Sequence, residues 1–249
     1  MKETIGLDIG ATSIKGGVVD LEKGELIGDP HKLYTPDPKK PEDIAQVVAE
    51  MLDLIGRRNL PVGIGFPAVI KDRKSLTASN IHSSWIGYPI FDMFSKIIPG
   101  HFNIINDADA AGLAEINYGA GKNKSGTVIL LTLGTGIGSA IFKDGLLLRN
   151  TELGLLKYRG ALAENFASNT ARKKFNYTWN EYGMALNEIL EYIQLILSPK
   201  LIILGGGLSK MYEHYSDEIN PDLNVVLAQM QNNAGIVGAA YSLKLNGKA

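Results

Sequence analysis

One pattern of apolar and glycine residues occurs twice in the chain, in residues 4–20 and again in residues 128–144. In each stretch, alternating apolar residues lead into a glycine-rich turn that a second apolar run follows. Gly10 of the first stretch corresponds to Gly134 of the second, an offset of 124 positions. Alternation on both sides of a glycine turn is typical of a β-hairpin, and such a long repeat distance is no solenoid period. The sequence therefore predicts two similarly folded halves, each of which begins with a hairpin.

Outside the two hairpins, the pattern alternates between helix and strand. Apolar residues at three- and four-residue steps predict helices, and short apolar runs between turn signals predict strands. The predicted helices cover residues 44–55 and 182–197, and the predicted strands cover residues 62–66, 102–105 and 201–204. Residues 29–41, rich in proline and charge, are predicted to form a mobile surface loop. These elements indicate an α/β fold with mixed sheets, because each half opens with an antiparallel pair of strands.

The composition excludes several classes of function. The chain has 249 residues, a formal charge of −1 and no cysteine. A nearly neutral chain has no broad basic surface for nucleic acid or for an anionic membrane, and without cysteine it forms neither disulfides nor thiolate zinc sites. No apolar stretch reaches membrane-spanning length, and the N-terminal residues have no apolar signal core. We therefore expect a cytoplasmic protein with no nucleic-acid partner and no membrane partner.

The two glycine turns carry residues that suit phosphate binding. The first turn contains Asp8, Gly10, Thr12 and Lys15, and the second contains Gly134, Thr135 and Gly136. Glycine lets backbone N–H groups approach phosphate oxygens, hydroxyl groups donate to these oxygens, and a carboxylate can hold a hydrated Mg²⁺ ion. One turn of this kind is explained equally well as a tight hairpin that needs positive φ. Two such turns in duplicated halves favour a polyphosphate ligand that both turns contact.

Asn106 and Asp107 lie where a predicted strand ends and an alanine-rich helix begins. Ligands of open α/β sheets bind at this end of the strands. Both residues are also good N-caps, so capping of the helix is the simpler explanation for each. A kinase, however, needs one carboxylate that orients the acceptor hydroxyl and takes its proton, and Asp107 is the candidate. Asp109 is interpreted as a first-turn charge that complements the helix dipole.

Four segments, LDIGATSIKGG, NDADAAGLAE, LTLGTGIGSAIFKDG and LIILGGGLSK, occur in the order and spacing of one known family. In these segments the chain resembles the ROK family of sugar kinases, within the sugar kinase and actin superfamily. The segments TASNIHSSWIG, NTELG with AENFAS, and NNAGIVGAA further resemble the polyphosphate glucokinases of that family, which make glucose 6-phosphate from polyphosphate, some of them also from ATP.

The resemblance implies duplicated ribonuclease-H-like α/β domains with mixed sheets that flank a cleft. We expect an N-terminal domain of residues 1–107 with 237–249 and a C-terminal domain of residues 108–236. Family relatives are commonly dimers, so a homodimer is expected as well.

The resemblance also implies a role for each candidate site residue. Asp107 is expected to act as the catalytic base, and the sugar is expected to be held by Asn80, Asn106, Glu152 and Glu164. The two glycine turns are expected to hold the phosphates, with Mg²⁺ positioned by Asp8 through water. Gly205, Gly206 and Gly207 are expected to line the nucleoside side of the donor site.

The chain departs from the family pattern shortly after Glu152. The family usually has histidine where this chain has Leu155, and leucine cannot donate a hydrogen bond worth about 1–2 kcal/mol to a sugar hydroxyl. Many relatives bind structural zinc through a cysteine cluster; this chain has no cysteine, so no zinc is expected.

The predicted function is phosphorylation of glucose at its 6-hydroxyl with polyphosphate or ATP as the donor. One alternative is an ATP-dependent kinase for another hexose or an amino sugar. The other is a sugar-binding sensor that has lost catalysis.

Two further features have both a functional and a structural explanation. Trp85 can stack on a sugar face or cover a core of neighbouring apolar residues. Two groups of basic residues, one of Lys71, Arg73 and Lys74 and one of Lys122 and Lys124, can guide a phosphate chain, although scattered surface lysines are the usual explanation.

Overall fold

The computed structural model describes residues 2–78 and 80–245. The chain divides into two compact units. The N-terminal unit contains residues 1–114 and 233–249, and the C-terminal unit contains residues 115–232. The domain limits inferred from the sequence, after residues 107 and 236, stay a prediction.

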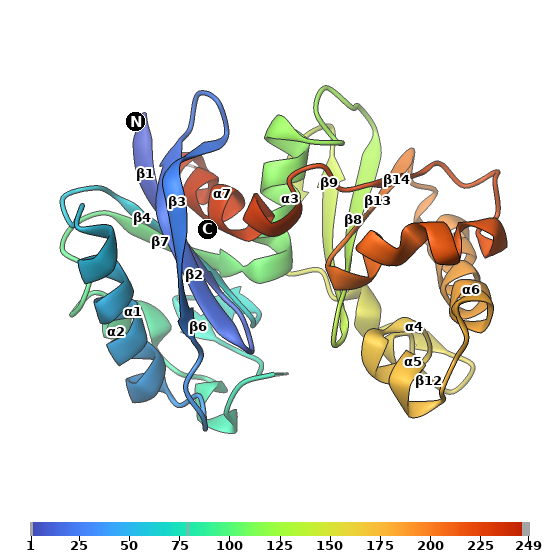
Figure 1. The fold of residues 1–249 in the computed structure, drawn as a ribbon, viewed down its shortest axis with the longest axis horizontal. Helices are drawn as coiled ribbons and strands as arrows, with labels where there is room; N and C mark the ends of the chain where they lie inside the picture. Colours follow the sequence, from blue (N-terminus) through green and yellow to red (C-terminus); the bar gives the residue numbers. More distant parts are fainter. Residues whose placement is uncertain (1, 79, 246–249) are drawn as a thin grey trace. The chain divides into compact units, whose positions relative to one another are not determined.

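Each unit is built on a mixed five-stranded sheet (Figure 1). The order is β3-β2-β1-β4-β7 in the N-terminal unit and β10-β9-β8-β13-β14 in the C-terminal unit. In both sheets, three antiparallel strands are followed by two parallel ones. The strands of the first sheet are β1 (Glu3–Ile9), β2 (Ser13–Asp20), β3 (Glu25–Tyr34), β4 (Val62–Phe66) and β7 (Phe102–Asn106). Those of the second are β8 (Thr127–Leu133), β9 (Ile137–Lys143), β10 (Leu146–Leu148), β13 (Leu201–Gly205) and β14 (Val225–Leu227).

The duplication inferred from the sequence is confirmed in the strands themselves. Strand β1 spans residues 3–9 and β8 spans residues 127–133, which is the offset of 124 positions. Two small two-stranded sheets are added to this plan. They pair β5 (Ile70–Lys71) with β6 (Lys74–Ser75) and β11 (Lys157–Tyr158) with β12 (Ala161–Leu162).

The helices begin and end at the signals expected for them. The helix α1 starts with a proline at Pro41 and stops at Gly56, which has a left-handed φ of 68°. Thr178 caps α6 and exchanges hydrogen bonds with Glu181 in a capping box. The α-helices are α1 (Pro41–Ile55), α2 (Ile90–Phe94), α3 (Asp107–Tyr118), α4 (Glu164–Ala167), α5 (Asn169–Lys174), α6 (Trp179–Leu197) and α7 (Ala234–Tyr241). Short 3₁₀ turns cover Ser83–Trp85, Leu153–Leu155, Gly207–His214, Ser216–Glu218, Gln231–Asn233 and Ser242–Lys244.

In the N-terminal unit, α1 and α7 cover opposite faces of the sheet (Figure 1). A Cβ added at Gly16 would meet Leu7 of β1 and Met51 of α1. One added at Gly6 or Gly63 would overlap the backbone of α7. Neighbouring residues of a strand point to opposite faces, so Gly6 faces α7 and Leu7 faces α1. The α7 backbone therefore lies directly on β1 and β4, which only glycine permits at these two positions.

The prediction of a loop over residues 29–41 is wrong for its first part. Residues 29–34 belong to β3, which pairs with β2 along one side only. An edge strand tolerates proline and charged residues because half of its backbone groups face away from the sheet. Pro30 and its charged neighbours therefore occupy an edge strand here.

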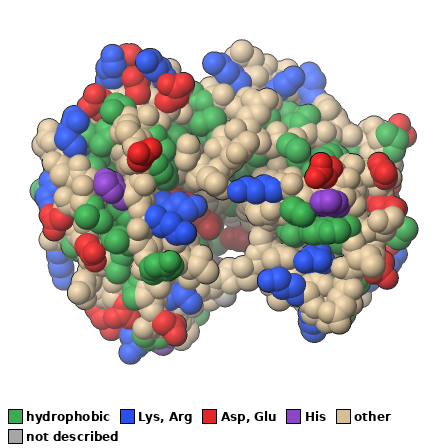
Figure 2. All heavy atoms as spheres, in the orientation of Figure 1, with side chains coloured by type: hydrophobic (Ala, Val, Ile, Leu, Met, Phe, Trp, Pro, Cys, Tyr) green, Lys and Arg blue, Asp and Glu red, His purple; other side chains and the backbone are tan. Residues whose placement is uncertain are grey.

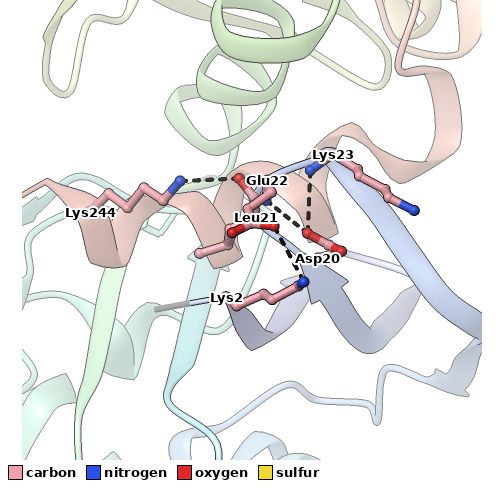
Figure 3. Close-up of polar contacts among 6 residues, drawn as sticks. All are labelled: Lys2, Asp20, Leu21, Glu22, Lys23 and Lys244. Carbon is pink, nitrogen blue, oxygen red and sulfur yellow. Dashed lines mark hydrogen bonds and ion pairs between the residues drawn. The ribbon is translucent and has the colours of Figure 1, made fainter.

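Asp20 holds the turn between β2 and β3 (Figure 3). Its Oδ1 accepts hydrogen bonds from the Glu22 and Lys23 N–H groups at 2.8 and 3.3 Å. These bonds, the Glu22 one above all, lower the pKa of the Asp20 carboxyl. Asp144, its counterpart in the duplicated half, accepts from the Gly126 N–H at 2.6 Å. Asp20 therefore stabilises its own turn, whereas Asp144 joins the turn after β9 to the residue before β8.

Each unit has its own apolar core. Trp85 is fully buried in the N-terminal core, packs against Phe66 and Tyr88, and donates to the Lys39 carbonyl at 2.8 Å. The structure thus gives Trp85 the packing role. In the C-terminal unit, α6 contributes apolar residues such as Leu186 and Ile193 to the core. None of the helices in residues 2–78 and 80–245 has the length and apolar character needed to cross a membrane.

Candidate active site

The first glycine turn joins β1 to β2 and is fastened by a threonine from the end of β3. The Gly10 N–H donates to the Ser13 carbonyl at 3.0 Å, which closes the turn. The Thr35 hydroxyl donates to the Gly10 carbonyl at 2.7 Å, and the Thr35 N–H donates to the Thr12 carbonyl at 3.2 Å. Carbonyl oxygens repel an anion, and two of those in this turn are already hydrogen-bonded to Thr35.

Asp8 lies on β1 directly before this turn, opposite Lys15 on β2. A Cβ added at Gly235, in the first turn of α7, would lie 2.6 Å from the Asp8 Cγ. Burial raises the pKa of the Asp8 carboxyl, and the positive charge of Lys15 partly opposes this rise. One crowded, partly desolvated carboxylate therefore lies beside the first glycine turn.

Asn106, at the end of β7, and Asp107, at the start of α3, make different contacts with the helix. Asn106 is buried and its Oδ1 accepts from the Ala108 and Asp109 N–H groups at 2.8 and 3.1 Å, so Asn106 caps α3. The Asn106 amide group also donates to the Ala68 carbonyl at 3.3 Å. Asp107 is half-buried, and its Oδ1 accepts from the Ala108 N–H at 2.9 Å. Asp109 is almost fully buried and is not a solvent-facing charge.

Asp8 and Asp107 lie near the same edge of the sheet. Asp8 pairs with Gly65 across β1 and β4, and Phe66 pairs with Asn106 across β4 and β7. The carboxyl ends of these parallel strands therefore meet, and two strand spacings amount to about 10 Å. A Cβ at Gly65 would lie 3.7 Å from the Asp107 Cα, so this glycine makes room for the start of α3. Asn80 is exposed, in the segment between β6 and the Ser83–Trp85 turn.

In the C-terminal unit, the second glycine turn lies against Glu164 of α4. The Gly134 N–H donates to the Gly136 carbonyl at 3.0 Å, and the Ile137 N–H donates to Glu164 Oε2 at 3.4 Å. A Cβ at Gly136 would overlap the Glu164 carboxylate. Glycine is therefore needed at Gly136 for the acid to reach the turn.

Glu152 belongs to the same cluster as Glu164. It is half-buried, and burial raises the pKa of its carboxyl, with a smaller contribution from the negative charge of Glu164. The two acids are thus close enough to interact electrostatically. Leu155, three residues later, keeps 44% of its surface exposed.

The glycine triplet at the end of β13 packs against the end of β8, next to the second glycine turn. Gly206 has φ of 81°, and a Cβ there would lie 2.6 Å from the Leu133 carbonyl oxygen. The C-terminal unit therefore brings together Gly134, Thr135, Gly136, Glu152, Glu164, Gly205, Gly206 and Gly207. The N-terminal unit brings Asp8, Gly10, Thr12, Lys15, Asn106 and Asp107 to one sheet edge.

Three supporting residues were not identified from the sequence. They are Thr35 and Thr170, whose hydroxyls bind carbonyls of the two turns, and Ser139, which is hydrogen-bonded on both sides of Glu152. A single threonine or serine carries no pattern of its own. Their contacts join positions far apart in the chain, such as 170 and 135.

The fold is that of a sugar kinase made of duplicated ribonuclease-H-like domains. The structure matches that of the inorganic polyphosphate/ATP-glucomannokinase from Arthrobacter sp. strain KM with a TM-score of 0.94 and 41% identity, over 98% of this chain and 99% of that one. It also matches a ROK family glucokinase from Streptomyces griseus, solved with glucose and AMPPNP, with a TM-score of 0.83 and 25% identity, over 98% of this chain and 100% of that one.

The chain belongs to the ROK family, whose model matches residues 4–153. The polyphosphate glucokinase of Mycobacterium tuberculosis (strain CDC 1551 / Oshkosh) is 43% identical over 238 residues, which cover 95% of this chain and 89% of that protein. The polyphosphate glucokinase of Mycobacterium leprae is also 43% identical, over 95% of this chain and 73% of that protein. The family and fold class inferred from the sequence are confirmed.

Proposed function

We propose that this protein is a glucokinase that transfers the terminal phosphoryl group of polyphosphate or ATP to the 6-hydroxyl of glucose. The observation that carries the proposal is the position of Asp107, a half-buried carboxylate at the sheet edge that also holds Asp8 and the first glycine turn. Relatives at 41% and 43% identity are named for polyphosphate-dependent phosphorylation of glucose or of glucose and mannose.

In the proposed reaction, the oxygen of the sugar hydroxyl attacks the terminal phosphorus of the donor. An O–P bond to glucose forms while the bond from phosphorus to the rest of the donor breaks. Asp107 orients the hydroxyl and accepts its proton. Glu152 and Glu164 accept hydrogen bonds from other sugar hydroxyls, and Asn80 and Asn106 complete the sugar site.

The two glycine turns bind the donor phosphates through backbone N–H groups, hydroxyls and Lys15. Mg²⁺ neutralises charge on the donor oxygens when it is bound. A single carboxylate that holds the ion through water would be sufficient, because Mg²⁺ usually keeps several waters and is held mainly by substrate phosphates. Asp8 fits this role, since burial raises its pKa and a neighbouring cation would offset that cost.

The test measures glucose 6-phosphate formation with polyphosphate and with ATP, over a panel of hexoses and amino sugars. Glucose should be the preferred acceptor. Asp107→Asn should lower kcat by about three orders of magnitude or more, while calorimetry shows glucose affinity close to that of the unchanged protein.

Near-normal turnover of Asp107→Asn would remove the base assignment. Activity with ATP alone and a preference for another sugar would favour the alternative of an ATP-dependent kinase for another hexose or an amino sugar. Glucose binding without product from either donor would favour a sugar-binding sensor that has lost catalysis. Leu155, in place of the usual histidine, would then be one of the changes that accompany this loss. The homodimer stays a prediction.

A further inference from the structure

The short helix α5 ends in three consecutive basic residues, Arg172, Lys173 and Lys174. Both lysine side chains are exposed, and within the described part of the chain no acidic side chain forms an ion pair with any of the three. Figure 2 shows blue Lys and Arg side chains at the lower right of the view, where Figure 1 places α5. The last turn of a helix stabilises cations, and Lys174 Nζ lies 5.3 Å from the centre of the Phe175 ring. Three neighbouring positive charges without an acidic partner still repel one another, so the group attracts an anion.

This helix is attached directly to the second glycine turn. The Asn169 N–H donates to the Gly134 carbonyl at 2.9 Å, and the Thr170 hydroxyl donates to the Thr135 carbonyl at 2.7 Å. Residues three and four positions apart lie next to each other on a helix. Lys173 and Lys174 therefore follow Thr170 on the same side, one helical turn away from the phosphate-binding turn.

The surroundings of the turn differ in charge on its two sides. Glu164 lies against Gly136 and Ile137, with Glu152 beside it. The basic end of α5 follows the contacts to Gly134 and Thr135. Acids are suited to sugar hydroxyls and repel phosphate, so a polyanion is directed toward α5.

Arg172 is held in place at the inner end of the basic group. Its guanidinium carbon lies 4.4 Å from the centre of the Trp179 ring, and its Nη1 donates to the Tyr177 carbonyl at 3.5 Å. A guanidinium that is already ordered loses little side-chain entropy when it binds an anion.

We propose that α5 binds the phosphate units of a polyphosphate chain that follow the reacting one, a proposal that rests on the proposed function. A repeating linear anion matches consecutive cations, whereas a nucleotide ends in a nucleoside after three phosphates. The site gives polyphosphate an affinity for the protein that increases with chain length. It takes no part in bond formation or cleavage.

The experiment compares Lys173→Gln/Lys174→Gln with Lys143→Gln/Lys200→Gln, in which two other exposed lysines of the same unit lose the same charge near Asp144, at the end of β8 and β9 remote from the second glycine turn. Steady-state kinetics are measured with long-chain polyphosphate, tripolyphosphate and ATP. The α5 variant should raise KM for long chains about three- to tenfold, as expected for two solvent-exposed charge contacts. Its KM for tripolyphosphate and ATP and its kcat should change less than about twofold.

The salt dependence gives a second readout. Binding of a linear polyanion releases counterions in proportion to the contacts made, so the α5 variant should show a shallower rise of long-chain KM with salt. Equal effects in both double variants would indicate only a general electrostatic field and would overturn the α5 site. An unchanged long-chain KM would overturn it as well.

Failure of the proposed function is distinguishable from failure of this site. If neither donor yields glucose 6-phosphate, calorimetry with long-chain polyphosphate still compares the three proteins. Weaker binding in the α5 variant alone would then support the site, and equal binding would refute it.

Discussion

The Ser139 hydroxyl accepts a hydrogen bond from the Leu153 N–H at 2.9 Å and donates one to the Thr151 carbonyl at 2.7 Å. These two partners are the neighbours of Glu152 on either side. Ser139 is almost fully buried in β9, the strand that follows the second glycine turn. One hydroxyl therefore fixes the backbone of a proposed sugar-binding acid relative to a proposed phosphate-binding turn.

We predict that Ser139→Ala weakens glucose binding more than donor binding. The change leaves a buried N–H and a partly buried carbonyl without their partner, which costs about 1–3 kcal/mol of unfolding free energy. Because Glu152 is then less well held, glucose KM should rise severalfold while polyphosphate KM stays nearly constant. Ser95→Ala is the control, since it removes an exposed hydroxyl bonded to the Asp92 carbonyl. A purely structural role for Ser139 would lower the stability and leave the ratio of the two KM values unchanged.

The raised pKa of Glu152 predicts a pH dependence of glucose binding. An ionised carboxylate accepts hydrogen bonds from sugar hydroxyls, and protonation removes this capacity. Since burial and the charge of Glu164 raise the pKa, glucose KM should begin to rise at a higher pH than for an ordinary glutamate as the pH falls. The folding stability, by contrast, should rise as the pH falls through the raised pKa of Glu152, because protonation removes the cost of burying its charge.

The Glu164→Gln variant tests this assignment. Removal of the neighbouring negative charge lowers the pKa of Glu152, so the inflection of glucose KM should move to lower pH. In Glu152→Gln the inflection should disappear. An inflection that stays in place in both variants would show that another group controls it.

The sequence predicts the duplicated sheets well because the hairpin pattern is local. Strands β1 and β8 follow directly from apolar alternation and the offset of 124 positions. By contrast, the contact of Thr170 with Thr135 depends on how α5 folds back onto a turn 35 positions earlier. Local patterns contain no information about such contacts. The sequence also left Asn106 and Asp107 equivalent as caps, and only the side-chain geometry shows that Asn106 holds two N–H groups of α3.

Leu155→His should improve glucose binding. Leu155 is exposed in the 3₁₀ turn that follows Glu152, so a histidine there can reach solvent or a bound sugar. One added hydrogen bond is worth about 0.5–1.5 kcal/mol, which lowers glucose KM by about two- to tenfold. The KM for the donor serves as the internal control and should not change. A rise in glucose KM would indicate that the leucine packs on the sugar instead.

Gly63→Ala should destabilise the protein strongly. A Cβ at this position in β4 would overlap the Ala239 carbonyl group, so the backbone of α7 would have to move away from the sheet. Overpacking costs about 1–3 kcal/mol, and the upper end is expected where the clash is with backbone. Gly207→Ala is the matched control, because a Cβ there meets no heavy atom within 4 Å and φ is not positive. Denaturant unfolding of the two variants should differ by most of the predicted amount; similar midpoints would contradict the close packing.

Gly235→Ala should displace the Asp8 carboxylate without destabilising α7. The added Cβ would lie 2.6 to 2.9 Å from the carboxylate atoms of Asp8 and not against backbone, so the short acidic side chain must move while the helix stays in place. Alanine also favours the helix over glycine by about 1 kcal/mol. The unfolding free energy should therefore change little.

The Mg²⁺ dependence of turnover provides the readout for that displacement. If Asp8 positions the metal through water, the Mg²⁺ concentration for half-maximal activity should rise about tenfold in Gly235→Ala, the equivalent of about 1.4 kcal/mol. Asp8→Asn should show the same direction of change with a larger effect, because the negative charge itself is lost. The contradicting outcome is a normal Mg²⁺ requirement in Gly235→Ala together with a loss of activity in Asp8→Asn. The carboxylate would then work equally well from a displaced position. The close contact of α7 with Asp8 would have no role in catalysis.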